Sequence, residues 1–214
     1  MVLNRFFGWG LRSVLCNLFL VGMLFSTPIP VAAMEDLSEA EARLRSGDVE
    51  GALSLFNLAA TNGDLAAQNR IGLLYYSGVL VTKNPELAFS WFKKAADAGD
   101  AKSQFMLASL YLNGSGTVRD ATSAAQYFEL AAEQGDVDAQ AMLGTLYFES
   151  SDALRDYNLA AKWLTSAANQ DNSQAQFVLA KLYHEGLGVT QDYAEAARWY
   201  QQAANKGHPG AHFS

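Results

Sequence analysis

Cysteine is absent from this chain beyond residue 33, because the single cysteine among 214 residues, Cys16, lies in an apolar N-terminal segment. The residue before it is Leu15, whereas a lipoprotein cleavage site calls for a small residue there. Without other thiols, the rest of the chain forms no disulfide and offers no thiol chemistry. Packing alone must then stabilise the fold, and tandem helical pairs can provide it.

Basic residues are also scarce. Two of the 15 basic residues, Arg5 and Arg12, and none of the 22 acidic ones precede residue 34, which leaves 13 basic against 22 acidic residues and a formal net charge of −9. Such a charge repels the phosphates of nucleic acid and of anionic lipid. The composition therefore argues against nucleic acid as a partner.

The N-terminal apolar run is short. Residues 14–25 fall below the length of about 20 residues that a membrane-spanning helix needs. Two prolines and the small residues up to Ala33 follow the run, and two arginines precede it, which is typical of a signal peptide. We expect residues 1–33 to be cleaved after Ala33, with export to the periplasm or secretion and no membrane span afterwards. The alternative is an uncleaved N-terminal anchor.

The sequence contains one pattern that is repeated four times at a spacing of 36 residues. In each copy a glutamine stands seven residues before a tyrosine, and leucines, small residues and paired alanines keep the same register. These columns are Gln68, Gln104, Gln140 and Gln176; Tyr75, Tyr111, Tyr147 and Tyr183; Leu74, Leu110, Leu146 and Leu182; Gly72, Ala108, Gly144 and Ala180; and Ala95-Ala96, Ala131-Ala132, Ala167-Ala168 and Ala203-Ala204. A period in this range indicates a solenoid of stacked supersecondary units.

Each unit has the periodicity of two helices. Ile71, Leu74 and Tyr75 recur at helical spacing in the first half of one unit, as Leu87 and Trp91 do in the second. Helix-ending glycines and N-capping Asp or Asn residues fall between the halves and between the units. These residues are Gly78, Gly114, Gly186, Gly99, Gly135 and Gly207, and Asn84, Asp120, Asp156, Asp192, Asp100, Asp136 and Asn172. We expect an all-α fold, an α/α solenoid of antiparallel helix pairs.

The repeated glutamines and aromatic residues have structural explanations. A partly buried amide must find hydrogen-bonding partners, so we interpret the glutamine column as a tie between adjacent turns. Large aromatics fill the space between units, next to the small columns that allow close helix approach. Those aromatics are Trp91, Tyr127, Trp163 and Trp199.

The units resemble Sel1-like repeats, a tetratricopeptide-like family. The fourth unit matches the family pattern best, with Ala175-Gln176, Leu182-Tyr183, Gly186-Leu187-Gly188-Val189 and Trp199-Tyr200. We expect residues 34–64 to form an N-terminal capping helix pair, a degenerate unit, and residues 65–214 to hold four units and a truncated fifth. The third unit departs from the pattern at Ser150 and Asp152, where it lacks glycines.

The resemblance implies a non-catalytic scaffold or adaptor that binds protein and needs no cofactor, and it places the binding groove on the concave face of the first helices. Columns that vary between units are free to face a ligand there. We predict a partner-binding groove that offers apolar anchors with a polar rim, suited to a peptide or helix. The predicted groove residues are Asn69, Leu73, Tyr76, Phe105, Leu112, Phe148, Phe177, Lys181 and His184.

The same aromatics have a second interpretation, packing against a neighbouring repeat. If Phe105 and Phe148 belong to the groove, replacing both with alanine abolishes partner capture without changing helicity or melting. Unfolding of that variant would place both rings in the core. We expect the scaffold to regulate or assemble a bacterial cell-envelope complex, and a glycan-binding scaffold for exopolysaccharide is an alternative in which such rings stack on sugars.

The C-terminal end of the array offers a second contact surface. Residues 208–212 begin a fifth unit, with His212 in the glutamine column, and the last full unit is left with Trp199 and Tyr200 near a face without an evident neighbour. This face is a candidate docking surface or homo-oligomer contact. The alternative is that the tail folds back over it.

Enzyme and metal signatures are weak. Ser90 and Lys93 have the Ser-x-x-Lys spacing of serine β-lactamases, and the family includes members linked to β-lactams, so a β-lactam-binding or cell-wall-directed enzyme is an alternative. No Lys-Thr-Gly or Ser-Asp-Asn motif accompanies this pair. His208 and His212 are four residues apart, but Pro209 lies between them and no third metal ligand is evident. The glycines follow helices and form no phosphate-binding loop.

Overall fold

The computed structural model describes residues 31–150 and 153–213. Over these residues the chain forms ten α helices, one short 3-10 helix and no strand, so the expected all-α fold is confirmed. The elements are α1 (Val31–Ser46), α2 (Val49–Thr61), α3 (Leu65–Ser77), α4 (Pro85–Asp97), α5 (Ala101–Asn113), α6 (Ala121–Glu133), α7 (Val137–Glu149), α8 (Tyr157–Ala168), α9 (Ser173–Glu185), α10 (Tyr193–Asn205) and η1 (Pro209–Phe213). The predicted signal peptide falls mainly on residues 1–30, outside this description.

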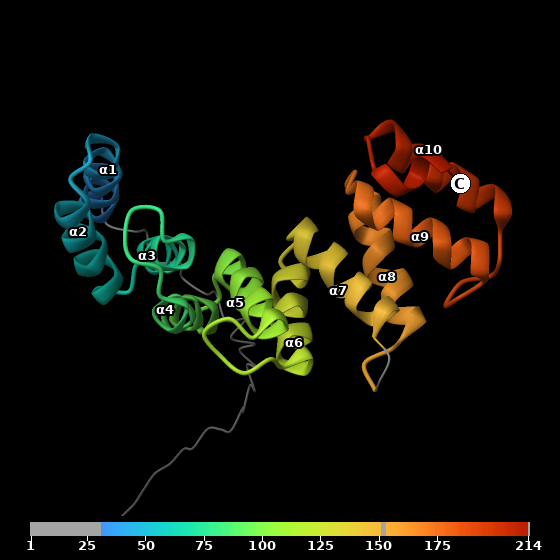
Figure 1. The fold of residues 1–214 in the computed structure, drawn as a ribbon, viewed down its shortest axis with the longest axis horizontal. Coiled ribbons are helices and arrows are strands. Elements are labelled where there is room, and N and C mark those ends of the chain that lie inside the picture. The colour runs from blue at the N-terminus through green and yellow to red at the C-terminus, as the bar shows by residue number, and fades with distance from the viewer. Residues whose placement is uncertain (1–30, 151–152, 214) are drawn as a thin grey trace, which may run out of the picture.

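Successive helices form pairs, and we call the odd-numbered member of each pair the first helix and the even-numbered member the second helix. Figure 1 shows the pairs following one another in an elongated array, from α1 and α2 at one end to α9 and α10 at the other. From α3 to α9 every first helix has 13 residues. Equal lengths keep the repeated columns in register, so corresponding residues occupy corresponding places along the array.

Local chemistry sets the helix ends as the sequence predicted. Asp64, Asp100, Asp136 and Asn172 precede the first helices, and each side chain accepts a hydrogen bond from a backbone N–H of the first turn. Asp120, Asp156 and Asp192 cap the second helices α6, α8 and α10 in the same way. Three first helices end at glycines in the left-handed conformation, Gly78, Gly114 and Gly186.

The loop between first and second helices contacts the preceding repeat. Gly116 and Gly188 have φ values of 71° and 67°, and a Cβ atom on either would run into the backbone carbonyl of the residue that begins the preceding second helix. That residue is Pro85 for Gly116 and Tyr157 for Gly188. The second glycine of the loop therefore allows close backbone approach between neighbouring repeats.

The third full unit turns differently, as its missing glycines suggested. Ser150 follows α7 with φ −58° and ψ 138°, an extended conformation, where the other units have a left-handed glycine. The Ser150 hydroxyl donates to the Leu146 carbonyl at 2.6 Å and so satisfies a carbonyl at the helix end. Asp152 lies outside the described residues.

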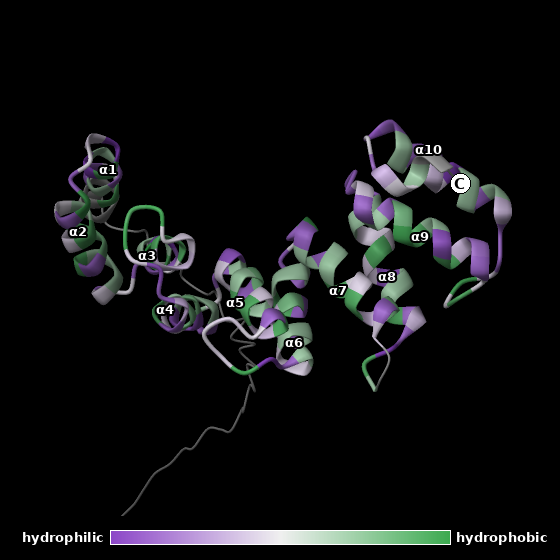
Figure 2. Ribbon diagram, in the orientation of Figure 1, coloured by the Kyte–Doolittle hydropathy of each residue, from purple (hydrophilic) through white to green (hydrophobic). Residues whose placement is uncertain are grey.

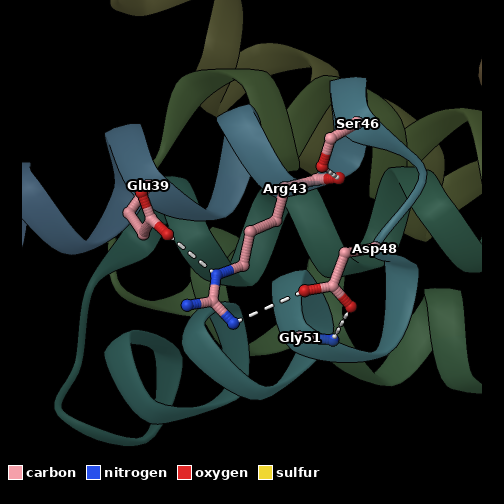
Figure 3. A network of polar contacts seen from close by, with 5 residues as sticks. All are labelled: Glu39, Arg43, Ser46, Asp48 and Gly51. Carbon is pink, nitrogen blue, oxygen red and sulfur yellow. Dashed lines mark hydrogen bonds and ion pairs between the residues drawn. The ribbon is translucent and has the colours of Figure 1, made fainter.

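The N-terminal pair is joined by a much tighter connection and a polar network (Figure 3). Arg43 on α1 donates to Glu39 at 2.9 Å and to Asp48 at 3.5 Å, and Asp48 in turn accepts from the Gly51 backbone N–H at 3.0 Å. A Cβ atom on Gly51 would overlap this Asp48 carboxylate. The expected leading helix is thus present, and it runs from Val31, earlier than the sequence suggested.

The buried core lies within and between the pairs. One apolar column of the first helices, Ile71, Leu107, Leu143 and Leu179, is fully buried, whereas the tyrosine column is half-buried at Tyr75, Tyr111 and Tyr183. The loop between α3 and α4 is hydrophobic and exposed instead (Figure 2), with Val79 at 80% and Leu80 at 44% exposure. Buried columns of this kind thus hold the fold, while apolar residues outside them reach solvent.

Candidate partner-binding surface

The repeated glutamines lie beneath the candidate surface and tie each first helix to the preceding second helix. Each side-chain amide donates to an alanine carbonyl eight residues earlier, at 3.0 to 3.2 Å. The pairs are Gln68 with Ala60, Gln104 with Ala96, Gln140 with Ala132 and Gln176 with Ala168. All four glutamines are buried, so the structural interpretation of this column is confirmed.

The nine predicted groove residues all keep contact with solvent. Tyr76 and His184 are exposed, and the other seven, from Asn69 to Lys181, are half-buried. Tyr76 has the apolar loop residues Val79 and Leu80 close after it in the chain, and the Lys83 ammonium lies 5.9 Å from its ring centroid. The exposed aromatic residue of the first full unit therefore stands beside exposed aliphatic residues and a cation.

Three predicted groove phenylalanines pack against the second helix of their own repeat. Ring centroids lie 5.5 Å apart for Phe105 and Phe128, and 6.2 Å apart for Phe148 and Tyr157. Phe177 lies 5.6 Å from the Tyr200 ring. Each of the three therefore has both an exposed part and a packing role.

Phe177 is the most enclosed of these rings. The His208 imidazole stacks on it with centroids 4.4 Å apart and planes 21° apart, and the Lys181 ammonium lies 4.7 Å from its centroid. His208 is bound at both ring nitrogens: Nε2 lies 2.8 Å from the Gln174 side-chain oxygen, and Nδ1 accepts from the Gly210 backbone N–H at 3.2 Å. Burial lowers the pKa of His208 below its usual value, and the Lys181 charge lowers it further. The Gly210 N–H at Nδ1 and the lowered pKa both favour the neutral imidazole with its proton on Nε2.

A cleft of about 690 Å³ lies among the first helices of the N-terminal half. Leu37 of α1, Leu65 and Asn69 of α3, and Lys102 of α5 line it, together with Gln134 at the end of α6. Across it, Arg70 pairs with Glu41 at 2.6 Å, and the Asn69 amide donates to the Ser103 hydroxyl at 2.8 Å. Of the nine predicted groove residues, only Asn69 lines this cleft. The other lining residues lie outside the varying columns that predicted the groove.

A polar contact between repeats occurs at Tyr127. Its hydroxyl donates to Asp97 of the preceding repeat at 2.9 Å, and the Lys93 ammonium lies 2.8 Å from the same carboxylate. The Lys93 hydrogen bond holds the pKa of Asp97 below its usual value, the Asp97 hydrogen bond raises the pKa of Lys93, and burial raises the pKa of Tyr127. The ion pair lies within α4, and the Tyr127 hydroxyl joins it to the next repeat.

The Ser-x-x-Lys spacing does not produce a nucleophile pair. The Ser90 hydroxyl donates to the Leu87 carbonyl of its own helix at 2.8 Å, and Lys93 binds Asp97. A serine acyl-enzyme requires a base that contacts the nucleophilic hydroxyl, and Lys93 does not contact Ser90 in this way. Among residues 31–150 and 153–213, no group of three metal-ligating side chains is assembled. No helix in this part of the chain has the length and apolarity needed to cross a bilayer.

Comparison with protein-family models identifies the repeats. The Sel1 repeat model matches residues 39–64, 65–100, 101–136, 137–172 and 173–208. These consecutive matches cover more than half of the chain. No curated protein gives a significant match.

Solved structures give the same fold. The chain resembles c5321, a protective antigen of uropathogenic Escherichia coli with an SLR fold, at 30% identity and a TM-score of 0.76 over 85% of this chain and 41% of that one. It resembles a Sel1 repeat protein from Oxalobacter formigenes at 34% identity and a TM-score of 0.71, over 82% and 71% of the two chains. The Pseudomonas aeruginosa immunity protein Pa5087, at 22% identity and a TM-score of 0.50 over 87% and 70%, shares the fold. This chain thus spans about two fifths of the Escherichia coli antigen.

Proposed function

Because this chain belongs to the Sel1 repeat family, we propose that it is a non-catalytic scaffold whose first-helix groove binds a partner protein. The partner segment is a peptide or helix with apolar anchors. The proposal includes export to the periplasm or secretion, and a role in regulating or assembling a bacterial cell-envelope complex. Export rests on the N-terminal sequence, and the envelope role on the resemblance of the repeats to exported family members.

One observation carries the binding proposal. The glutamine column and the apolar column of Ile71, Leu107, Leu143 and Leu179 are buried, whereas the nine varying groove residues all reach solvent. Residues that reach solvent and change between otherwise equivalent units are the ones that can recognise different parts of a ligand. The cleft of about 690 Å³ among α1, α3 and α5 includes the groove residue Asn69 in its lining and has room for an anchor side chain of the partner.

The glycan alternative receives less support from the ring contacts. Sugar stacking needs an open aromatic face, but His208 stacks on the Phe177 ring and the Lys181 ammonium lies 4.7 Å from its centroid. Phe105 and Phe148 are engaged with Phe128 and Tyr157. The enzyme alternative is likewise disfavoured, because Ser90 and Lys93 are bound to other groups.

The test is site-specific photo-crosslinking in the native cell envelope. A photoreactive residue at position 76 should crosslink one protein, and the double variant Tyr76→Ala with His184→Ala should not retain it in affinity capture. Both residues are exposed, so the variant should fold normally. The matched control is Leu58→Ala with Leu130→Ala, which removes exposed apolar side chains from second helices, at 55% and 45% exposure. If the groove double variant and the control double variant recover the same proteins in equal amounts, the proposal that the groove binds the partner is wrong.

Export is tested separately. Cell fractionation should find the protein outside the cytoplasm, and N-terminal sequencing should start at Met34. Recovery of an intact N-terminus from the cytoplasm would contradict export but would leave the groove proposal standing, because the photo-crosslink is an independent readout.

A further inference from the structure

Apolar side chains contribute much of the lining of the cleft of about 690 Å³ in the N-terminal half. Phe56 of α2 is 1% exposed and lies among the lining residues, together with the half-buried Leu37 of α1 and Leu65 of α3. Ala66 and Ala101 line the cleft as well, and their small side chains fill little of its space. Such a lining favours an apolar group of a ligand.

The two carboxylates among the lining residues of this cleft are already engaged. Glu41 pairs with Arg70 at two places, Oε1 with Nε at 2.6 Å and Oε2 with Nη2 at 2.9 Å. Asp100 caps α5, where its side chain accepts a hydrogen bond from the Ser103 backbone N–H at 2.8 Å. Neither carboxylate therefore neutralises the remaining cation of the lining, Lys102.

Lys102 is left as the unpaired cation of the cleft. Its side chain is exposed, and among the described residues it has no ion-pair or hydrogen-bond partner. It lies in the first turn of α5, and Ala66 lies in the first turn of α3, so the N-terminal ends of two helices also border the cleft. The partial positive charge of a helix N-terminus adds to that of the ammonium group. The cleft thus combines an apolar lining with unbalanced positive charge.

The residues that correspond to Lys102 in the later units have a different role. They are Asp138 and Gln174, and each binds the residue 34 positions further along the chain: Asp138 accepts from Asn172 at 3.3 Å, and the Gln174 side-chain oxygen lies 2.8 Å from His208 Nε2. Lys102 makes no bond of this kind with a described residue and lines the cleft instead. Its charge is therefore available to a ligand and does not tie two repeats together.

We infer that this cleft takes an apolar side chain of the partner segment together with a carboxylate beside it. The apolar group lies against Leu65 and Phe56, and the carboxylate pairs with Lys102. The inference rests on the proposed function, because the segment is the one that the first-helix groove binds, and it adds the chemistry of one anchor, a leucine-sized residue next to Asp or Glu. Charge complementarity selects this anchor, since a basic neighbour would face the unpaired ammonium group. Because Lys102 is exposed, its pairing with the carboxylate contributes selectivity more than affinity.

Small molecules test the chemistry of the cleft without knowledge of the partner. The probe is isocaproate, a carboxylate on a leucine-like carbon chain, titrated into the full chain and followed by the backbone amide NMR signals of Ala66 and Ala101. Its shifts should saturate, with a dissociation constant about two- to fivefold lower than that of isohexanol, the effect of one exposed ion pair. Acetate has the same charge without the apolar chain, and it should bind at least about tenfold more weakly than isocaproate.

Two variants of the chain locate the charge that recognises the carboxylate. Lys102→Gln should abolish the preference for isocaproate over isohexanol and leave the affinity for isohexanol unchanged. The matched control is Lys162→Gln, which removes an exposed lysine charge from α8, outside the lining of the cleft, and should keep the preference of the parent. Both lysines are exposed, so both variants should fold like the parent. Equal binding of isocaproate and isohexanol by the parent, or an unchanged preference in Lys102→Gln, would overturn the inference.

A second photo-crosslinking position separates this inference from the proposed function. A photoreactive residue at position 66, in the lining of the cleft, should capture the same protein as position 76. The crosslinked segment should hold an apolar residue within about four residues of an Asp or Glu, the spacing of neighbours on one helix face. Capture at position 76 but not at position 66 would overturn the inference and leave the groove proposal standing. Capture at neither position would contradict the proposed function and the inference with it.

Discussion

Gln134 donates its side-chain amide to the Oε1 atom of Gln104, 2.7 Å away and on the preceding first helix. Gln170 does the same for Gln140 at 2.8 Å. The buried glutamine is thereby satisfied on both sides, donating to the repeat before it and accepting from the end of its own repeat's second helix. The Oε1 atoms of Gln68 and Gln176 are buried without this second partner. Ala98, which has no donor, stands in the corresponding position for Gln68, and Lys206, which pairs with Asp171 at 3.2 Å, stands in that position for Gln176.

Ala98→Gln should therefore stabilise the protein. The Gln68 Oε1 atom is buried without a hydrogen-bond partner, and Ala98 occupies the same C-cap position in its unit as Gln134 does. Supplying the donor should raise the free energy of unfolding by about 1 kcal/mol, measured by urea denaturation. Ala98→Glu is the matched control, since it has the same shape but only acceptor oxygens. Equal stability of both variants would show that the amide does not reach Gln68.

Gly188→Ala should destabilise the contact between the third and fourth full units. The substitution imposes a positive φ on alanine and drives its Cβ atom into the Tyr157 carbonyl, so a loss of about 2 kcal/mol or more is expected in denaturant unfolding. Gly135→Ala separates the cost of the positive φ from the cost of the clash with the carbonyl. Gly135 also has a positive φ, at 90°, but nothing lies within 4 Å of its added Cβ, so it should lose only about 1 kcal/mol.

The sequence was sufficient for the parts of the fold that depend on local chemistry. Helix ends at residues such as Asp100 and Gly114, and the glutamine ties, repeat with the period and need no knowledge of distant contacts. The surroundings of Phe177 could not be read in this way, because His208 lies in the tail, where the 36-residue pattern stops. Variation within a column also cannot separate groove from packing, since Phe105 has an exposed part and a packed part at once.

Replacing Phe105 and Phe148 with alanine should consequently lower the melting temperature. Both rings contact an aromatic ring of the following second helix, so their removal leaves gaps at partly buried sites. Each substitution should cost about 1 to 3 kcal/mol, less than the 3 to 5 kcal/mol of a fully buried phenylalanine. Tyr76→Ala, at a 36% exposed position, should stay within about 0.5 kcal/mol. An unchanged melting temperature in the double variant would assign both rings to the surface.

Acidification should weaken the C-terminal end of the array through His208. Its pKa is lower in the folded protein than in the unfolded chain, where it is about 6.5, so unfolding takes up protons between these two values. The stabilisation by neutral His208 is complete above pH 6.5 and is lost as the pH falls through the folded-state pKa. The groups that face the ring are Lys181 and Gln174 of α9, and Tyr200 lies behind Phe177 on α10. Lys181 stays charged throughout this range and does not alter the sign.

The measurement is the stability of the protein between pH 7.5 and 5.5, compared with His208→Gln, which keeps an amide near Gln174 but does not titrate. The parent should lose stability relative to the variant as the pH falls, and NMR titration of the His208 ring should give a pKa below 6.5. Protonation places a proton on Nδ1, where the Gly210 N–H now points, so the amide of Gly210 should exchange faster at the acidic end. Parallel stability curves for the two proteins would show that His208 is protonated equally in the folded and unfolded chains, and would contradict the neutral, doubly bound imidazole.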